Sequence, residues 1–263
     1  MLTFISGLLT GTAAGFIGVG GGEFRIPVLV RVLRLPLRVA AGVNLAVGLV
    51  TVTLSVYRRW GRTTLSDDDL ALVLTMCSAS IVGAVLGVIV RQRVPTGPLG
   101  AFVRAYLVLV GIWMLYESFA HAEHVLLNPT GAARLLLAGA TAFVIAALSG
   151  VLGVAGGEMR IPVLLYLFGL SIIEAGTLSL MASIPTLAAG AMTDRRLSGL
   201  PNTALRVVLV MGLASAVGVL LGAALIPYAD RHVIKGALEV VLLLSAIRLT
   251  PHHSAQLEPT TGR

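Results

Sequence analysis

The stretch GVGGGEFRIPVL, from Gly18 to Leu29, returns as GVAGGEMRIPVL from Gly153 to Leu164. The copies keep a constant offset of 135 residues, from 18 to 153, and differ only at their third and seventh positions. In an otherwise apolar chain, each copy holds a glycine run, an acid, an arginine and a proline. Because glycine runs interrupt helices and proline restricts the backbone, the stretch predicts a broken helix in each half of the chain.

We call Gly18–Gly22 and Gly153–Gly157 the two glycine strings. The composition of the chain around them is that of a membrane protein. Hydrophobic residues make up 57% of the 263 residues and charged residues 12%, and the mean hydropathy is +0.95. This leaves too little polar surface to cover a water-soluble globule. Uncharged stretches recur at the length needed to cross a hydrocarbon core of about 30 Å. They are Leu2–Gly22, Val39–Tyr57, Leu70–Val90, Leu135–Gly157 and Val207–Ala229. The sequence therefore predicts an all-α polytopic membrane protein.

The repeat extends well beyond the glycine strings. At the same offset, Thr51 aligns with Thr186, and ASIVGAVLG (79–87) aligns with ASAVGVLLG (214–222). Register kept over about a hundred residues indicates internal duplication, and the paired glycines of these blocks predict close helix packing. Each half contains four apolar segments, so we expect about eight transmembrane helices in two repeats of four. The expected divisions are a first repeat at 1–122, a linker at 123–132, a second repeat at 133–250 and a disordered polar tail at 251–263.

The second apolar segment of each half is too long for one crossing. Residues 26–35 would span about 15 Å as a helix, which is half of the membrane. We therefore expect a short broken or re-entrant half-helix after each glycine string, with its proline in the first turn. The expected landmarks are a half-helix from Ile26–Pro27, a turn near Leu35–Pro36, a full helix from Val39, a second turn at Phe168–Gly169 and a full helix from about Ile172.

The glycine strings are the predicted functional site. Glycines allow successive amide N–H groups to face one point, and the start of the next helix adds the positive end of its dipole, which together favour an anion. Two helix breaks at corresponding positions of two halves indicate the central site of a transporter. Arg25 and Arg160 would add positive charge, while Glu23 and Glu158 would fix the arginines or carry a coupling proton. The alternative interpretation is a tight surface loop with solvated charges.

Polar residues in the full helices complete the candidate site. Asn44 aligns with Ser179, and with Ser183 these residues either line a substrate cavity or hydrogen bond across helices. Because alanine resists left-handed backbone angles, Ala155 predicts that the anion-binding backbone of the second string is shaped differently from that of the first. We expect Gly20 to Arg25 to lie nearer the substrate. The predicted substrate-binding residues are Gly20, Gly21, Gly22, Arg25, Asn44, Ala155, Gly156, Gly157, Arg160, Ser179 and Ser183.

Several other functions are disfavoured. The net charge of +7 comes from basic residues scattered in ones and twos at the ends of apolar runs, so we expect no nucleic-acid partner. The glycine strings lack the Gly-Lys-Ser/Thr ending of a nucleotide phosphate loop. No HExxH or Gly-x-Ser-x-Gly motif occurs, the five histidines fall in predicted loops or the tail, and Cys77 is the single cysteine. We therefore expect no enzyme activity, no metal and no cofactor.

At these motifs the chain resembles the sulfite exporter TauE/SafE family of bacterial and archaeal membrane proteins. The resemblance rests on Gly18 to Gly22 followed by Ile26-Pro27, on the copy from Gly153 to Pro162, and on the two-half layout. It implies a permease of the cytoplasmic (inner) membrane that moves small sulfur-containing anions such as sulfite or organosulfonates. The expected function is a secondary carrier, with a passive anion channel as the nearest alternative and an intramembrane enzyme as a more remote one. The expected partners are a small anion and the lipid bilayer, with a homodimer left open.

Overall fold

The structure, a computed structural model, describes residues 1–60, 67–91, 105, 108–116, 125–194 and 202–248. Within these ranges the chain is helical, with short irregular connections and no strand. Residues 108–116 are also helical, although most of the predicted segment 98–119 lies outside the described residues, as does the predicted tail 251–263. The elements are α1 (Leu2–Ile17), α2 (Gly22–Pro27), the π-helix η1 (Val28–Val32), α3 (Leu37–Arg59), α4 (Asp67–Arg91), α6 (Gly131–Leu152), α7 (Gly157–Phe168), α8 (Ile172–Thr193), α9 (Asn202–Leu225), the 3₁₀ turn η3 (Ile226–Tyr228) and α10 (Arg231–Arg248).

Five of these helices are long and apolar enough to cross a membrane: α3, α4, α6, α8 and α9 with its 3₁₀ extension. The first helix, α1, is apolar but shorter. Large apolar side chains such as Leu9, Leu74, Leu136 and Leu213 lie on the outside of the molecule, where a bilayer rather than water would contact them. The predicted all-α membrane fold is therefore confirmed, whereas the arrangement of eight helices in two repeats of four stays a prediction.

The short helices expected after the two glycine strings are present, but they begin earlier than expected. Helix α2 begins at Gly22 and α7 at Gly157, so Pro27 and Pro162 lie inside the helices. The prediction that each proline occupies the first helical turn is wrong, because the last glycine of each string already has helical geometry. A proline at the sixth helical position provides no N–H for the carbonyl four residues before it, and in the first half the chain continues as the π-helix η1.

The breaks that follow the short helices agree with the sequence. Pro36 precedes α3, which begins at Leu37, two residues before the expected Val39. Gly169 ends α7 in the left-handed conformation, and α8 begins at Ile172 as expected. Ser171 starts α8 with a capping box: its hydroxyl accepts from the amide of Glu174, whose carboxylate accepts from the amide of Ser171.

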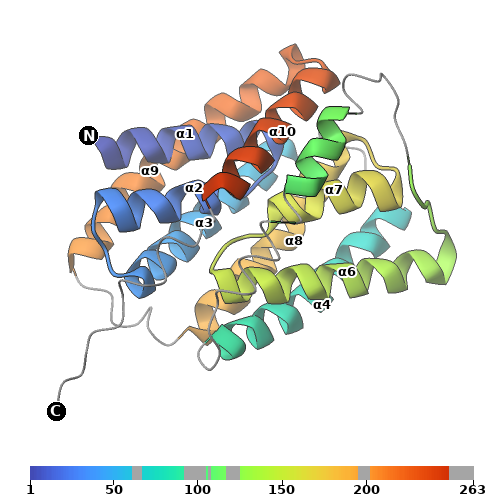
Figure 1. Ribbon diagram of the computed structural model, residues 1–263, viewed down its shortest axis with the longest axis horizontal. Helices are drawn as coiled ribbons and strands as arrows, with labels where there is room; N and C mark the ends of the chain where they lie inside the picture. The colour runs from blue at the N-terminus through green and yellow to red at the C-terminus, as the bar shows by residue number, and fades with distance from the viewer. Residues whose placement is uncertain (61–66, 92–104, 106–107, 117–124, 195–201, 249–263) are drawn as a thin grey trace.

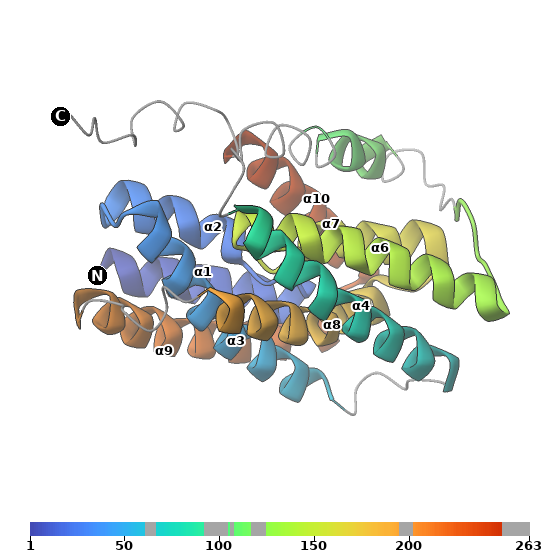
Figure 2. The same cartoon turned by 90° about the horizontal axis from the view of Figure 1, so that it is seen from below.

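Helices from the two halves pack in pairs through glycine faces, as the small-residue pattern predicts. Helix α1 packs along α9, and α4 packs along α6 (Figures 1 and 2). A Cβ on Gly87 of α4 would overlap the carbonyl of Ala147 on α6, and a Cβ on Gly11 of α1 would overlap the carbonyl of Ser215 on α9. These glycines let the helix backbones approach closely.

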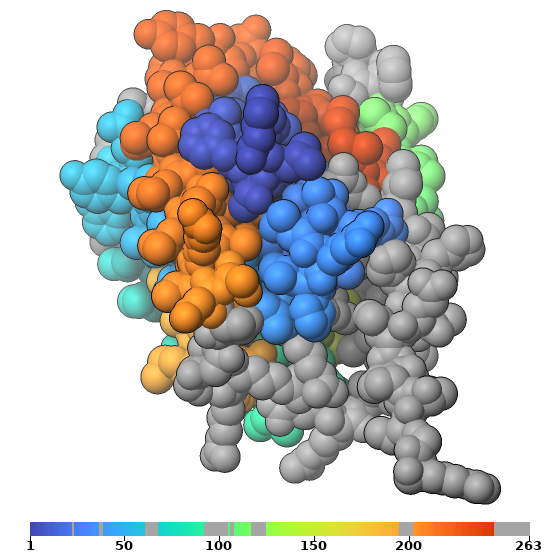
Figure 3. All heavy atoms as spheres, turned by 90° about the vertical axis from the view of Figure 1, so that its left-hand side faces the viewer, coloured from blue at the N-terminus to red at the C-terminus, as the bar shows by residue number. Residues whose placement is uncertain are grey.

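Helices at equivalent sequence positions run in opposite directions. Helix α1 runs from left to right in Figure 1, and α6, which occupies the positions 135 residues later, runs from right to left. The end view in Figure 3 shows the start of α1 between α9 and the segment from α2 to α3. The full helices α3 and α8 contact each other and both short helices pack on their own full helix. The two helix breaks therefore face each other in the interior.

Candidate functional site

Both glycine strings turn the chain from a long helix into a short one. Gly18 and Gly153 end α1 and α6 in the left-handed conformation, with φ of 100° and 75°. Gly21 and Gly156 precede the short helices with φ of 68° and 73°. Each string therefore contains two left-handed residues with two other residues between them. Glycine is needed at both positions because residues with a side chain resist this conformation.

The two strings contact each other. A Cβ on Gly20 would lie closer than 3.0 Å to the Cβ of Ala155, and a Cβ on Gly157 would lie 3.2 Å from the amide nitrogen of Gly20. The explanation of the Gly20/Ala155 difference by backbone strain is wrong, because neither residue has a positive φ. The mismatch has a packing cause: where the strings touch there is room for one methyl group, and the second string supplies it.

The first buried arginine fastens α2 to its neighbours. Arg25 is fully buried, and its Nε donates to the hydroxyl of Thr10 on α1 over 3.2 Å. Its Nη2 donates to the carbonyl of Gly20 over 2.7 Å and to the hydroxyl of Thr51 on α3 over 3.1 Å. The guanidinium thus connects the string with the helices on both sides. Thr10 was missed by the sequence analysis, since the aligned position in the second half is an isoleucine and gives no signal.

The second buried arginine binds three polar groups of α8. Arg160 is also fully buried, and its Nη1 donates to the carbonyl of Ser179 over 3.1 Å and to the hydroxyl of Ser183 over 2.9 Å. Its Nη2 lies 3.4 Å from the hydroxyl of Thr186. Thr51 and Thr186 align at the 135-residue offset, so the repeat preserves an arginine–threonine contact in both halves. The interpretation as solvated surface loops is not compatible with this burial.

A polar side chain lies over the start of each short helix. A Cβ on Gly22 would be 2.8 Å from the side-chain nitrogen of Asn44, and one on Gly157 would be 3.4 Å from the hydroxyl of Ser179. Asn44 donates across the halves to the carbonyl of Gly153 over 2.8 Å. Within the described part of the chain, the side-chain oxygens of Asn44 and Ser179 are buried without a hydrogen-bond partner. Both oxygens are therefore available to a ligand that donates hydrogen bonds.

An acidic residue follows each glycine string directly, and the structure describes the side chain of only one of them. Glu158 is buried, with 1% of its surface exposed. Glu23 belongs to α2, but its side chain lies outside the described residues. A carboxyl group at this depth is costly to ionise unless positive charge is near, and Arg160 lies two residues further along the same helix.

Two charged contacts that sequence reasoning missed lie at the ends of long helices. Arg59, at the end of α3, is buried and donates to the carbonyls of Gly15 and Phe16 at the end of α1. A cation at a helix C-terminus is favourable for the dipole and for the unpaired carbonyls. Arg91 forms an ion pair with the buried Asp194 at the end of α8. Positions 59 and 194 align at the 135-residue offset and lie at the ends of α3 and α8. Because they carry opposite charges, the sequence alignment did not indicate that they are equivalent.

A model of the sulfite exporter TauE/SafE family matches residues 3–254 of this chain. The chain belongs to the sulfite exporter TauE/SafE family. The match covers both glycine strings and nearly the whole sequence, so the TauE/SafE resemblance expected from the motifs is confirmed. This TauE/SafE protein is a transmembrane permease of a family named for sulfite export, as the apolar helices also indicate. No curated protein and no solved structure matches the chain.

Proposed function

We propose that this TauE/SafE protein is a secondary carrier that moves a small sulfur-containing oxyanion, such as sulfite or an organosulfonate, between its two glycine strings. The main support is the pair of fully buried arginines, Arg25 and Arg160, one directly after each string. Their hydrogen bonds to Thr10, Thr51 and Ser183 hold the guanidinium groups in fixed orientations. Oriented positive charge in a low-dielectric interior attracts an anion strongly.

The uncharged groups of the site suit the partly protonated form of such an anion. Backbone amides at Gly20 to Gly22 and at Ala155 to Gly157 would donate to its oxygens. The side-chain oxygens of Asn44 and Ser179 would accept from a hydroxyl or amine group of the cargo. An asparagine on one side and a serine on the other makes the two faces unequal, which would orient an asymmetric anion.

We also propose the remaining parts of the assignment. The protein would reside in the cytoplasmic membrane of a bacterium or archaeon, with repeats at 1–122 and 133–250, and it would act without enzymatic chemistry. A homodimer is compatible with its apolar exterior. Glu23 and Glu158 would carry the coupling proton, because a carboxyl group beside a buried arginine can exchange a proton as the anion arrives and leaves.

Flux in proteoliposomes tests the anion site. Arg25→Gln and Arg160→Gln should each lower sulfite flux by more than about tenfold, the effect of losing about 1.4 kcal/mol of stabilisation. Arg25→Lys and Arg160→Lys keep the charge and should retain more flux than the glutamine variants. The control is Arg206→Gln, which removes an exposed arginine of α9 and should leave flux unchanged. Wild-type flux in both glutamine variants would contradict the charged site.

The same vesicles separate a carrier from a passive channel. A carrier should show saturating flux that depends on a proton gradient, whereas a channel should give linear, high-rate current. Glu158→Gln should abolish the dependence on the proton gradient while anion exchange between equal compartments continues. Asp68→Asn, which alters an exposed carboxylate at the start of α4, is the control. Gradient-driven flux in the Glu158→Gln variant would exclude Glu158 as the coupling group.

A further inference from the structure

The two buried arginines differ in which edge of the guanidinium group the protein uses. An arginine carries one N–H on Nε and two on each Nη, and its Nε–Nη2 edge can bind two oxygens of one oxyanion at once. In the first half the protein occupies this edge. The Nε of Arg25 donates to the hydroxyl of Thr10, and the Nη2 donates to the carbonyl of Gly20.

The same edge of Arg160 is open. Its Nη1 donates to the carbonyl of Ser179 and to the hydroxyl of Ser183, which uses both N–H groups of that nitrogen. The Nη2 lies 3.4 Å from the hydroxyl of Thr186. The Nε is buried, and no described residue accepts its N–H. Because a buried donor without an acceptor is unfavourable, this edge indicates a ligand that supplies oxygens.

The repeat explains why the edge is open in only one half. Thr10, the acceptor for Arg25, aligns with Ile145 at the 135-residue offset, and an isoleucine side chain accepts no hydrogen bond. Ile145 keeps the corresponding place beside its string. A Cβ on Gly156 would lie 3.1 Å from the Cγ2 of Ile145, much as a Cβ on Gly21 would lie 3.3 Å from the Cβ of Thr10. The second half therefore lacks the acceptor that the first half supplies.

An unpaired hydroxyl lies at the second string as well. Ser149 is fully buried, and within the described part of the chain its hydroxyl has no hydrogen-bond partner. Its carbonyl accepts from the amides of Gly153 and Val154, which fixes the end of α6 at the string. The hydroxyl lies against the string, because a Cβ on Gly156 would overlap it. The aligned residue of the first half is Ala14, so this hydroxyl is specific to the second half.

The open group over the first string has the opposite polarity. The side-chain nitrogen of Asn44 donates to the carbonyl of Gly153, which fixes the orientation of the side-chain amide. The side-chain oxygen lies 3.3 Å from the place of a Cβ on Gly22 and is therefore an acceptor. Since an acceptor repels the oxygens of an anion, the first string is the less favourable place for them.

We propose that the oxyanion group of the cargo binds at the second glycine string, to the Nε–Nη2 edge of Arg160 and the hydroxyl of Ser149. Arg25 is a positioning residue that holds the first string and does not contact the cargo. This inference rests on the proposed transport function, and it differs from the expectation that Gly20 to Arg25 lie nearer the substrate. The edge requires two oxygens on one central atom, as sulfite and organosulfonates have. Protonation of Glu158, the proposed coupling group, would remove a negative charge that competes with the anion.

The variant Ser149→Ala tests the site, because it should lower affinity without lowering stability. The hydroxyl has no partner, so its removal should leave the unfolding temperature unchanged or raise it. Binding of sulfite to purified protein in nanodiscs should weaken by about tenfold, with a parallel rise in the KM for transport, since one hydrogen bond to a charged group is lost. Ser80→Ala is the matched control and should change neither quantity. It removes an equally buried and unpaired hydroxyl on the face of α4 that carries Gly83 and Gly87.

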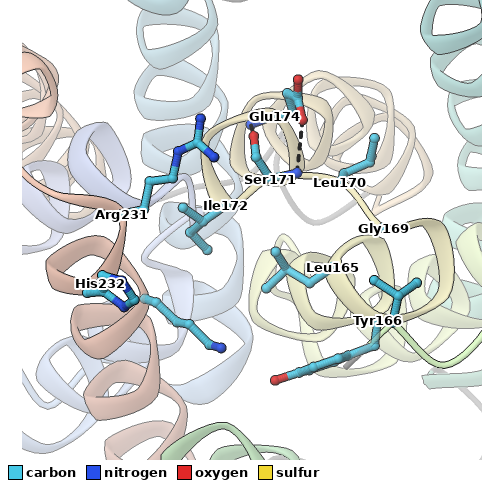
Figure 4. A pocket seen from close by; sticks show the side chains of 11 residues that line it. Leu165, Tyr166, Gly169, Leu170, Ser171, Ile172, Glu174, Arg231 and His232 are labelled. Atoms are coloured by element: carbon cyan, nitrogen blue, oxygen red, sulfur yellow. Dashed lines mark hydrogen bonds between the residues drawn. The ribbon is translucent and has the colours of Figure 1, made fainter. Parts of the chain in front are cut away.

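Lysine substitutions distinguish the two arginines, because lysine keeps the charge but lacks the two-donor edge. Arg160→Lys should raise the dissociation constant of sulfite by about tenfold or more, and Arg25→Lys by less than about threefold. The control Arg231→Gln removes an exposed arginine from the wall of a cavity of about 360 Å³ at the other end of α7 (Figure 4). Helix α7 has 12 residues and is about 18 Å long, so this variant should bind sulfite as the wild type does.

Several outcomes would overturn the inference while the transport function stands. An equal loss of affinity in Arg25→Lys and Arg160→Lys would place the oxyanion between both arginines, and a loss in Arg25→Lys alone would place it at the first string. Wild-type affinity in Ser149→Ala would overturn the inference even if Arg160→Lys does not fold. If the wild type neither binds nor carries sulfite or an organosulfonate, the proposed function fails and this inference fails with it.

Discussion

The contact between Gly20 and Ala155 gives a sharp test of how the two strings meet. A Cβ on Gly20 would lie closer than 3.0 Å to the Cβ of Ala155, whereas carbon atoms in contact are about 3.5–4.0 Å apart. Ala155 has no flexible atoms that could move aside, so the backbones must separate by at least about half an ångström. Overpacking of this kind costs about 1–3 kcal/mol. Gly20→Ala should therefore destabilise the protein by about that amount and lower transport.

The reciprocal exchange should restore what the single substitution removes. Gly20→Ala/Ala155→Gly places the methyl group on the other string and again leaves one methyl group at the contact. Gly20 has no positive φ, so alanine is not strained by its backbone. The stability of the double variant should exceed that of Gly20→Ala, with a coupling energy of about 1–3 kcal/mol in favour of the pair.

Thermal unfolding in detergent measures the effect, because Cys77 is the single cysteine and a thiol-reactive dye reports its exposure. Gly212→Ala is the control, since a Cβ there meets nothing within 4 Å, and it should be neutral or stabilising by up to about 1 kcal/mol. Sulfite flux of each variant is measured in parallel. If the two string substitutions are additive, so that the double variant is no more stable than Gly20→Ala, the strings do not meet as described.

Three further substitutions test the contacts that surround the strings. Arg59→Gln should lower the free energy of unfolding by about 2 kcal/mol or more, because two carbonyls at the end of α1 lose their donor; an unchanged unfolding temperature would show that water replaces it. Asp194→Asn should cost about 3 kcal/mol by leaving Arg91 without its carboxylate, and the exchange Arg91→Asp/Asp194→Arg should recover part of the loss unless the pair is not in contact. Gly87→Ala should separate α4 from α6, since the new Cβ meets the fixed carbonyl of Ala147; unfolding at the wild-type temperature would contradict the close packing.

Local sequence patterns were sufficient for the course of the main chain. Uncharged stretches of sufficient length predicted the long helices, and the glycine strings predicted the two breaks. The end of α7 at Gly169 and the start of α8 at Ile172 also agree, because glycine and a capping serine act on their own neighbours. The start of α2 was predicted four residues late, since the pattern does not reveal whether the last glycine of a string belongs to the break or to the helix.

By itself, the sequence determined that this is a helical membrane protein with a duplicated glycine string, and its motifs determined the TauE/SafE family. Only the tertiary structure decided that Gly20 and Ala155 touch, that Thr10 binds Arg25, and that Arg59 holds the end of α1. The physical reason is the separation along the chain of the groups that interact. A helix break depends on the conformational freedom of adjacent residues, whereas these contacts join groups distant in the chain, and their existence depends on how whole helices pack.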